Sequence, residues 1–435
     1  MKKYILLLIG LFLNLNAQSL DGSGLIENKV KTIIPQVDQF ITSYLKKLKA
    51  PGCVVAIVGP EEVYFLKAYG VKKLGKADLL TPRTIFQFAS VSKTISATLA
   101  VKLHHAGKLS LNEPINNYLL NFSLNGTQQP LCLKHIISHT SGLSNKGMNA
   151  LIESCAPRKS LYDRVQSQPV STQPGKWFDY HNIVYGLVED VLVSATGESF
   201  LELLQGNLFK PLGMRQASVG YQNMIIAKDR AYPHDISVKS KILHPAKNYS
   251  RCYYSVLASA GMNGSILDLI PFLQAQLGGR PEVLSSQDLK MLHASQIKAP
   301  ETLKKIKEKF PHISDSGYAL GWRWMDYAGE RVMYHGGWVN GSRPMIAFLP
   351  KYKVGIVILH HAETPFSFRT TMKFLDLFLG VSSSNQESQR SKKKTKKPIK
   401  ENKKVILKQT LYINSLSESS ICLNKVKAFF RAAPH

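Results

Sequence analysis

Residues 90–93 read Ser-Val-Ser-Lys and stand directly before a stretch whose small and apolar residues recur at helical spacing. A serine and a lysine three residues apart lie on the same face of a helix, so the hydroxyl of Ser90 is placed beside the amine of Lys93. Such an amine can activate a hydroxyl without any histidine. Because residues 86–90 have the pattern of a buried extended segment, we expect Ser90 at a strand-to-helix junction.

Taken alone, this spacing is weak evidence for chemistry. The S-x-x-K spacing recurs at residues 43–46, 295–298 and 391–394. An ordinary N-cap serine followed by a solvated lysine would give the same four letters. The predicted strand-to-helix junction is what distinguishes Ser90 from the other three serines.

Two further short patterns place polar residues beside a predicted element. Residues 180–182 read Tyr-His-Asn and run into a predicted helix. In an extended segment the first and third of these side chains point to the same face, although a turn tyrosine with a helix-capping asparagine would look the same. Residues 335–338 read His-Gly-Gly-Trp at the end of a predicted strand. Glycines there let another backbone or a substrate approach closely, and a β-bulge with an incidental histidine is the alternative.

The chain divides into three regions. Residues 1–18 have a basic start, a ten-residue apolar run and a small residue at position 17, which is typical of a secretory signal peptide. The apolar run is too short to cross a bilayer, and an uncleaved anchor is the alternative. Residues 30–380 have the composition of a globular domain. Residues 381–435 carry eight lysines between positions 392 and 404, and we expect a basic, disordered tail.

Strand patterns stand at both ends of the globular region, and helical patterns lie between them. Residues 52–58 and 63–69 predict a hairpin, and a second antiparallel set is expected at 331–334, 345–349 and 354–359. An amphipathic helix is predicted from 182 to 195, and an apolar helix from 366 to 379. This order predicts one sheet built from both chain ends, with a helical region inserted between them.

The formal net charge is +27, and the segment from residue 381 onward holds 13 Lys/Arg against 3 Asp/Glu. Such a balance favours an anionic cell-wall or membrane surface as a partner of the tail, with plain solubility as the alternative. We do not expect nucleic-acid binding, because the lysine run lacks interleaved aromatic residues.

The five cysteines are scattered and form no recognisable disulfide framework, so their pairing stays open. Cys53 and Cys132 lie in apolar runs and are expected to be buried. Neither the cysteines nor the histidines have the spacing of metal ligands, so we expect no metal and no cofactor.

Six sequence motifs, taken in their order along the chain, resemble those of the penicillin-recognising serine hydrolases of the class C β-lactamase and D,D-peptidase type. These motifs are FASVSKT (88–94), GKLSLNEP (107–114), SHTSGL (138–143), YHN (180–182), FKPLGM (209–214) and HGG (335–337). The resemblance covers about residues 35 to 380. It implies an α/β fold of the β-lactamase/transpeptidase type, in which helices flank an antiparallel sheet and a mainly helical region is inserted.

The resemblance also implies roles for individual residues. Ser90 would attack a carbonyl and form an acyl ester, while Lys93 and Tyr180 share the proton transfers. Asn182 would orient Lys93 and the substrate amide. The backbone N–H groups of Ser90 and Trp338 would bind the developing oxyanion.

The third motif departs from the β-lactamase pattern, because His335 stands where those enzymes usually have a lysine. His335, Gly337 and Trp338 are the predicted substrate-binding residues of this motif. Affinity for carboxylated substrates would then rise as His335 becomes protonated. The ring of Trp338 would narrow the cleft. We expect His181 to be a surface residue without a catalytic role.

These observations predict a serine hydrolase that is secreted across the inner membrane to the periplasm or the outside. Its expected substrates are D-amino-acid peptides, amides or esters, which include small molecules and peptidoglycan-derived peptides. A β-lactamase and a non-catalytic penicillin-binding or cell-wall-associated protein are the alternatives.

Overall fold

The computed structural model describes residues 2–124, 126, 128–237, 240 and 242–381, with residues 2–23 described by their backbone only. Its centre is an eight-stranded antiparallel sheet in the order β2-β1-β13-β12-β11-β10-β9-β8. The strands are β1 (Gly52–Val58), β2 (Val63–Gly70), β8 (Ile297–Lys298), β9 (Ile313–Tyr318), β10 (Arg323–Tyr327), β11 (Glu330–Gly336), β12 (Met345–Leu349) and β13 (Val354–His360). Strands from both chain ends therefore share one sheet, as predicted.

Strand β1 shows why the strand sequences are continuously apolar and do not alternate between apolar and polar residues. It pairs with β2 on one side and β13 on the other, with Val55 opposite Ile358. All seven residues of β1 are buried. Val55 faces a core shared with helices α1 (Lys2–Leu48) and α13 (Phe366–Leu379), whereas Val54 faces the core of the helical region. A sheet covered on both faces requires apolar residues at every position.

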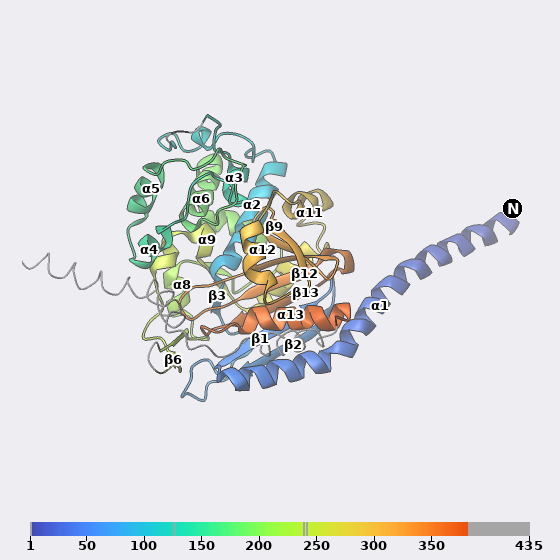
Figure 1. The fold of residues 1–435 in the computed structure, drawn as a ribbon. Helices are drawn as coiled ribbons and strands as arrows, with labels where there is room; N and C mark the ends of the chain where they lie inside the picture. The colour runs from blue at the N-terminus through green and yellow to red at the C-terminus, as the bar shows by residue number, and fades with distance from the viewer. Residues whose placement is uncertain (1, 125, 127, 238–239, 241, 382–435) are drawn as a thin grey trace, which may run out of the picture. The chain divides into compact units, whose positions relative to one another are not determined.

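Helices α1 and α13 lie side by side over one face of the sheet (Figure 1). The residues of α1 buried against this face recur every three or four positions, as an amphipathic helix requires. They are Val30, Ile33, Val37, Ile41 and Leu45. Among the described residues, no helix is long and apolar enough to cross a membrane. The signal peptide over residues 1–18 stays a prediction.

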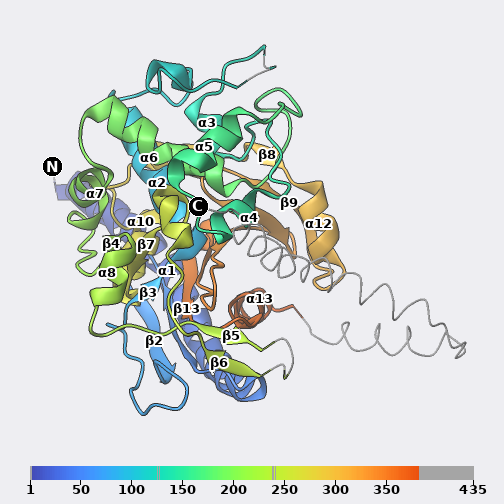
Figure 2. The same cartoon turned by 90° about the vertical axis from the view of Figure 1, so that its left-hand side faces the viewer.

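The other face carries the inserted helical region, which Figure 2 shows from the side. Its helices are α2 (Ser92–His105), α3 (Leu133–Ile137), α4 (Met148–Glu153), α5 (Arg158–Gln166), α6 (Asn182–Thr196), α7 (Phe200–Leu204), α8 (Tyr221–Ile226), α9 (Leu257–Ala260), α10 (Ile266–Gln276) and α11 (Ser286–His293). Helix α12 (Pro300–Lys307) instead packs through Leu303 and Ile306 against the core shared with α1 and α13. Helix α2 is buried along most of its length and packs against α6, α9 and α11. This burial explains the small and apolar residues after Ser90.

Two small sheets complete the fold. Strand β3 (Phe86–Gln87) pairs with β7 (Met262–Gly264), which also pairs with β4 (Ser218–Val219). Strands β5 (His234–Ile236) and β6 (Leu243–Pro245) form a hairpin. The β3–β7 pairing fixes the chain immediately before Ser90.

Among the described residues, two cysteines form a disulfide and two are free. Cys155 and Cys252 form a disulfide across a sequence separation of 97 residues. Cys53 and Cys132 are buried and free, as expected. Cys422 lies with residues 382–435 outside the described part of the chain, so the predicted disorder of the tail remains a prediction.

Candidate active site

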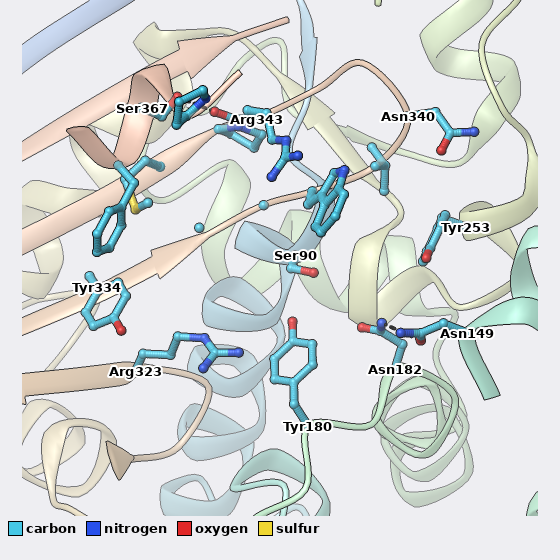
Figure 3. Close-up of a pocket in the computed structure, with 18 of the residues that line it drawn as sticks. Ser90, Asn149, Tyr180, Asn182, Tyr253, Arg323, Tyr334, Asn340, Arg343 and Ser367 are labelled. Carbon is cyan, nitrogen blue, oxygen red and sulfur yellow. Dashed lines mark hydrogen bonds between the residues drawn. The ribbon is translucent and has the colours of Figure 1, made fainter. Parts of the chain in front are cut away.

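A cavity of about 570 Å³ opens where the end of β11, the start of β10 and the helical region meet. Ser90, Tyr180, Asn182, Arg323 and Trp338 line it, and Figure 3 shows the hydroxyl of Tyr180 directed toward Ser90. Four of these five residues come from the three sequence patterns. The structure therefore brings together side chains that lie up to about 250 residues apart in the chain.

Ser90 lies in a 3-10 turn, Ala89–Val91, between β3 and α2, which is the predicted strand-to-helix junction. The residue before it, Ala89, has a φ of +46°. A non-glycine residue in this left-handed region costs about 1–3 kcal/mol and persists only where the surroundings hold it. The Phe88 N–H donates to the carbonyl of Met262 at 2.9 Å, which anchors the strained turn to β7. The strain thus presents the Ser90 hydroxyl at the start of α2.

The Lys93 side chain is fully buried, and three oxygen atoms surround its amine. Lys93 Nζ lies 2.7 Å from Asn182 Oδ1, 3.0 Å from the Ser259 carbonyl oxygen and 3.3 Å from Ser90 Oγ. Burial, helped by the positive charge of Arg323, holds the pKa of Lys93 well below its usual value. A neutral amine has two N–H bonds for the two carbonyl acceptors. Its lone pair is then left to accept the proton of Ser90.

Tyr180 is a second titratable group beside both Ser90 and the amine of Lys93. Burial raises the pKa of Tyr180 to about 12, while the positive charge of Arg323 and hydrogen bonds with Ser90 and Arg323 oppose that rise. The Arg323 guanidinium is 4.6 Å from the centre of the Tyr180 ring, and Lys93 Nζ is 4.7 Å from it. Tyr180 is therefore a neutral phenol near pH 7 that can donate a proton.

Asn182 connects Lys93 to the rest of the helical region. Its Oδ1 accepts from both Lys93 and the Ser259 hydroxyl, the latter at 3.1 Å, and its Nδ2 donates to Asn149 Oδ1 at 3.0 Å. These contacts fix which end of the amide faces the amine. The N-cap of α6 is His181, not Asn182, because its ring accepts from the Val184 N–H. His181 is 1 % exposed, so the expectation that it is a surface residue was wrong.

The end of β11 forms the wall opposite the helical region. A Cβ atom added at Gly337 would lie 2.8 Å from the Phe88 carbonyl oxygen and 2.9 Å from Ala89 Cβ. Only glycine therefore allows β11 to approach the Ser90 turn so closely. The Gly337 N–H donates to the Pro344 carbonyl at 2.8 Å, which holds the following peptide in place. The Trp338 ring lines the cavity and donates to Glu363 at 3.0 Å.

His335 does not line the cavity, unlike the neighbouring glycines and Trp338. Its side chain is fully buried, its Nδ1 donates to the Gly336 carbonyl at 3.0 Å, and its Nε2 accepts from the Tyr318 hydroxyl at 2.9 Å. Burial, together with the charges of Arg323 and Lys93, keeps the pKa of His335 well below its usual value. This geometry does not support the predicted role of His335 as a titrating carboxylate ligand.

Sequence reasoning missed several residues of the site. Arg323 is the cavity-lining cation beside Tyr180, and it comes from a strand that the sequence pattern did not reveal. Ser259 contributes through its main-chain carbonyl, for which side-chain patterns carry no signal. Asn149 is one turn before the end of α4 and is recognisable only through its contact with Asn182.

This constellation can perform acyl transfer. It offers a hydroxyl nucleophile on a strained turn, a buried amine as its base and a phenol as proton donor, and Gly337 and Trp338 line the same cavity. Together with the sheet and its helical insertion, the site defines a serine hydrolase of the S-x-x-K acyl-transfer type.

The comparisons with known proteins agree with this class. The chain belongs to the Beta-lactamase family, whose model matches residues 37–379, so the resemblance and the fold class inferred from the sequence are confirmed. It is 22% identical over 346 residues to Protein flp of Staphylococcus aureus (strain N315). That alignment covers 76% of this chain but 64% of the relative, so the chain spans less than two thirds of that protein's length.

Solved structures show the same fold. An octameric penicillin-binding protein homologue from Pyrococcus abyssi matches with a TM-score of 0.71 and 24% identity, over 80% of this chain and 77% of that one. The D-alanine carboxypeptidase AmpC from Burkholderia cenocepacia matches with a TM-score of 0.63 and 21% identity, over 81% of this chain and 99% of that one.

Proposed function

We propose that this chain hydrolyses D-amino-acid peptides, amides or esters through an acyl-enzyme on Ser90. The observation that carries the proposal is the amine of Lys93, which lies 3.3 Å from Ser90 Oγ while two carbonyl-type oxygens take its other hydrogen bonds. An amine held in this way is a base for the hydroxyl rather than a surface cation.

The reaction follows from the positions of the three groups. Ser90 Oγ attacks the substrate carbonyl carbon as its proton passes to Lys93. The C–N or C–O bond of the tetrahedral intermediate then breaks, and the Tyr180 hydroxyl donates its proton to the leaving atom. Tyr180 recovers a proton from Lys93, and water attacks the acyl ester with the same groups acting as base and acid.

Arg323 supports a substrate whose leaving group carries a carboxylate. It is the cavity-lining cation next to Tyr180, whose hydroxyl must reach the leaving atom. In a leaving D-amino acid, the carboxylate is two bonds from that atom, which brings it beside the guanidinium. Guanidinium groups bind carboxylates with two parallel hydrogen bonds. A carboxyl-terminal D-residue is therefore the leaving group that we propose.

Labelling and a substrate panel test the proposal. Wild-type protein is expected to react with a fluorophosphonate probe and to cleave a D-Ala-D-Ala peptide, whereas Ser90→Ala should do neither. Labelling that survives in Ser90→Ala would refute the mechanism. Folded wild-type protein that is never labelled would favour the non-catalytic binder. Faster turnover of a chromogenic cephalosporin than of peptides and nitrophenyl esters would favour the β-lactamase.

The role of Arg323 has its own readout. We expect Arg323→Gln to lower kcat/KM about tenfold or more for a peptide with a free terminal carboxylate, relative to the same peptide as its amide. Arg323→Lys keeps the charge and should retain part of this ratio. An unchanged ratio in Arg323→Gln would remove Arg323 from carboxylate recognition.

We also propose that the protein is exported to the periplasm or the outside. The disulfide between Cys155 and Cys252 supports this, because such cross-links form and persist in oxidising compartments. Loss of residues 1–18 from the mature protein, measured by intact mass, is the expected result. The basic tail is proposed to bind an anionic cell-wall or membrane surface, and deletion of residues 381–435 without any change in partition would contradict that.

A further inference from the structure

The side of the cavity away from Arg323 carries a carboxylate, Glu153, that the proposed acyl transfer does not use. Figure 3 shows Arg323 and Tyr253 on opposite sides of Ser90. The Tyr253 hydroxyl donates to Glu153 Oε1 at 3.1 Å, and both residues line the cavity. The site therefore has a cation on one side of the nucleophile and an anion on the other.

We propose that Glu153 binds an ammonium group in the acyl part of the substrate. This inference rests on the proposed function, because Arg323 and Tyr180 define which side takes the leaving group. The acyl part must then extend toward Tyr253 and Glu153. The substrate class is thus a peptide with a carboxylate on its leaving D-residue and a side-chain ammonium on its acyl part.

The position of Glu153 is fixed by one contact within helix α4 and one just beyond it. Asn149 and Glu153 are four residues apart and lie on the same face of this helix. Asn149 is bonded to Asn182 at 3.0 Å, so this face is turned toward the catalytic network. Just beyond α4, the disulfide from Cys155 to Cys252 joins the helix to the segment that carries Tyr253. The carboxylate is therefore held by its neighbours and by a covalent cross-link.

The spacing along α4 selects a long ammonium-bearing side chain. Four residues of helix advance about 6 Å along its axis, so Glu153 lies one turn beyond the Asn149–Asn182 contact. An α-ammonium two bonds from the scissile carbonyl would remain beside Ser90. We therefore assign to Glu153 the longer, lysine-type side chain on the residue that precedes the D-Ala-D-Ala end.

The charge of Glu153 is available to a ligand. Within the described residues, neither Glu153 nor Arg323 takes part in a salt bridge, whereas the third charged lining residue, Arg343, is paired with Glu363. Tyr253 contributes a neutral hydrogen bond and leaves the carboxylate charge in place. The cavity thus keeps one anion in a chain whose net charge is +27.

The test uses two peptides ending in Lys-D-Ala-D-Ala that differ only in acetylation of the lysine Nε. We expect the full-length wild-type enzyme to favour the free ammonium by about fivefold in kcat/KM, as a partly solvated charge pair provides. Glu153→Gln should bring this ratio close to one. The preference should weaken as the salt concentration rises.

Glu61→Gln is the matched control, because Glu61 is an exposed carboxylate on the β1–β2 turn and should leave the ratio unchanged. An unchanged ratio in Glu153→Gln, or a wild-type preference for the acetylated peptide, would overturn the ammonium site alone. If the wild type cleaves neither peptide and Ser90 is not labelled, the proposed function itself fails and the ammonium site with it.

Discussion

Replacement of Asn182 by aspartate tests whether Lys93 works as a neutral amine. The substitution keeps the shape of the side chain and puts a negative charge on the oxygen that lies 2.7 Å from Lys93 Nζ. In the wild type, burial lowers the pKa of Lys93, so kcat/KM should rise with pH through that pKa and then level off. A neighbouring carboxylate favours the ammonium form and should move this acid limb to higher pH.

The geometry sets the size of the effect. Two unit charges at this separation attract by about 6 kcal/mol at an effective dielectric constant of about 20. Burying the new carboxylate offsets part of that attraction. If about 3 kcal/mol remains, the acid limb moves up by about two pH units, since each unit corresponds to about 1.4 kcal/mol. At pH values on the wild-type acid limb, kcat/KM should then fall about 100-fold.

The assay is kcat/KM for a nitrophenyl ester against pH, with the second-order rate of fluorophosphonate labelling as a second readout for slow variants. Asn149→Asp is the control, because its charge would be one hydrogen bond further from Lys93 and should move the limb less. An Asn182→Asp enzyme with the wild-type acid limb would refute the assignment of Lys93 as the base. An equal displacement in both variants would show that the effect is not local.

Three further results are expected. Gly337→Ala should lower kcat in an ester assay at least about tenfold and the free energy of unfolding by about 1–3 kcal/mol, because the added Cβ crowds the Ser90 turn. Gly206→Ala, where a Cβ has open space, should change neither kcat nor the thermal melting temperature. Replacement of Cys155 and Cys252 by serine should lower the free energy of unfolding, measured in urea, by about 4–5 kcal/mol, as expected for a cross-link that closes a loop of 97 residues. A loss below about 1 kcal/mol would contradict this. The free energy of unfolding should also fall as the pH drops from 6.5 to 4. Three buried histidines have a pKa lowered to about 4, so in this window they bind protons in the unfolded chain but not in the folded one, and each can contribute up to about 3 kcal/mol. Equal urea midpoints at pH 7 and pH 5 would contradict this. These histidines are His181, His293 and His360.

Local patterns in the sequence predicted most of the elements that frame the site. The hairpin of β1 and β2, the strands β11 to β13 and helix α13 are found where apolar periodicity placed them. These features depend on residues within one or two turns of each other, so a single sequence carries enough information to predict them.

The edge of the sheet was not predicted. Strand β8 has two residues, and β9 and β10 mix polar with apolar residues, so their local signals are weak. Strand β10 is placed by pairing with β11, β9 by pairing with β10, and β8 by pairing with β9, and no local pattern records these pairings. Arg323 was missed for that reason, and His335 was assigned the charge that Arg323 supplies. The sequence also did not reveal that Cys155 pairs with Cys252, because the two cysteines are 97 residues apart.

The sequence by itself determined the nucleophile and its lysine, because Ser90 lies in a 3-10 turn that leads directly into α2, so a spacing of three residues brings it beside Lys93. Only the tertiary structure decided the charges of the cleft. It buried His335 in a neutral state, brought Arg323 beside Tyr180 and placed Glu153 on the opposite wall. The physical reason is that protonation and recognition depend on burial and on neighbours from distant strands and helices, which come together only when the sheet and its inserted helices pack.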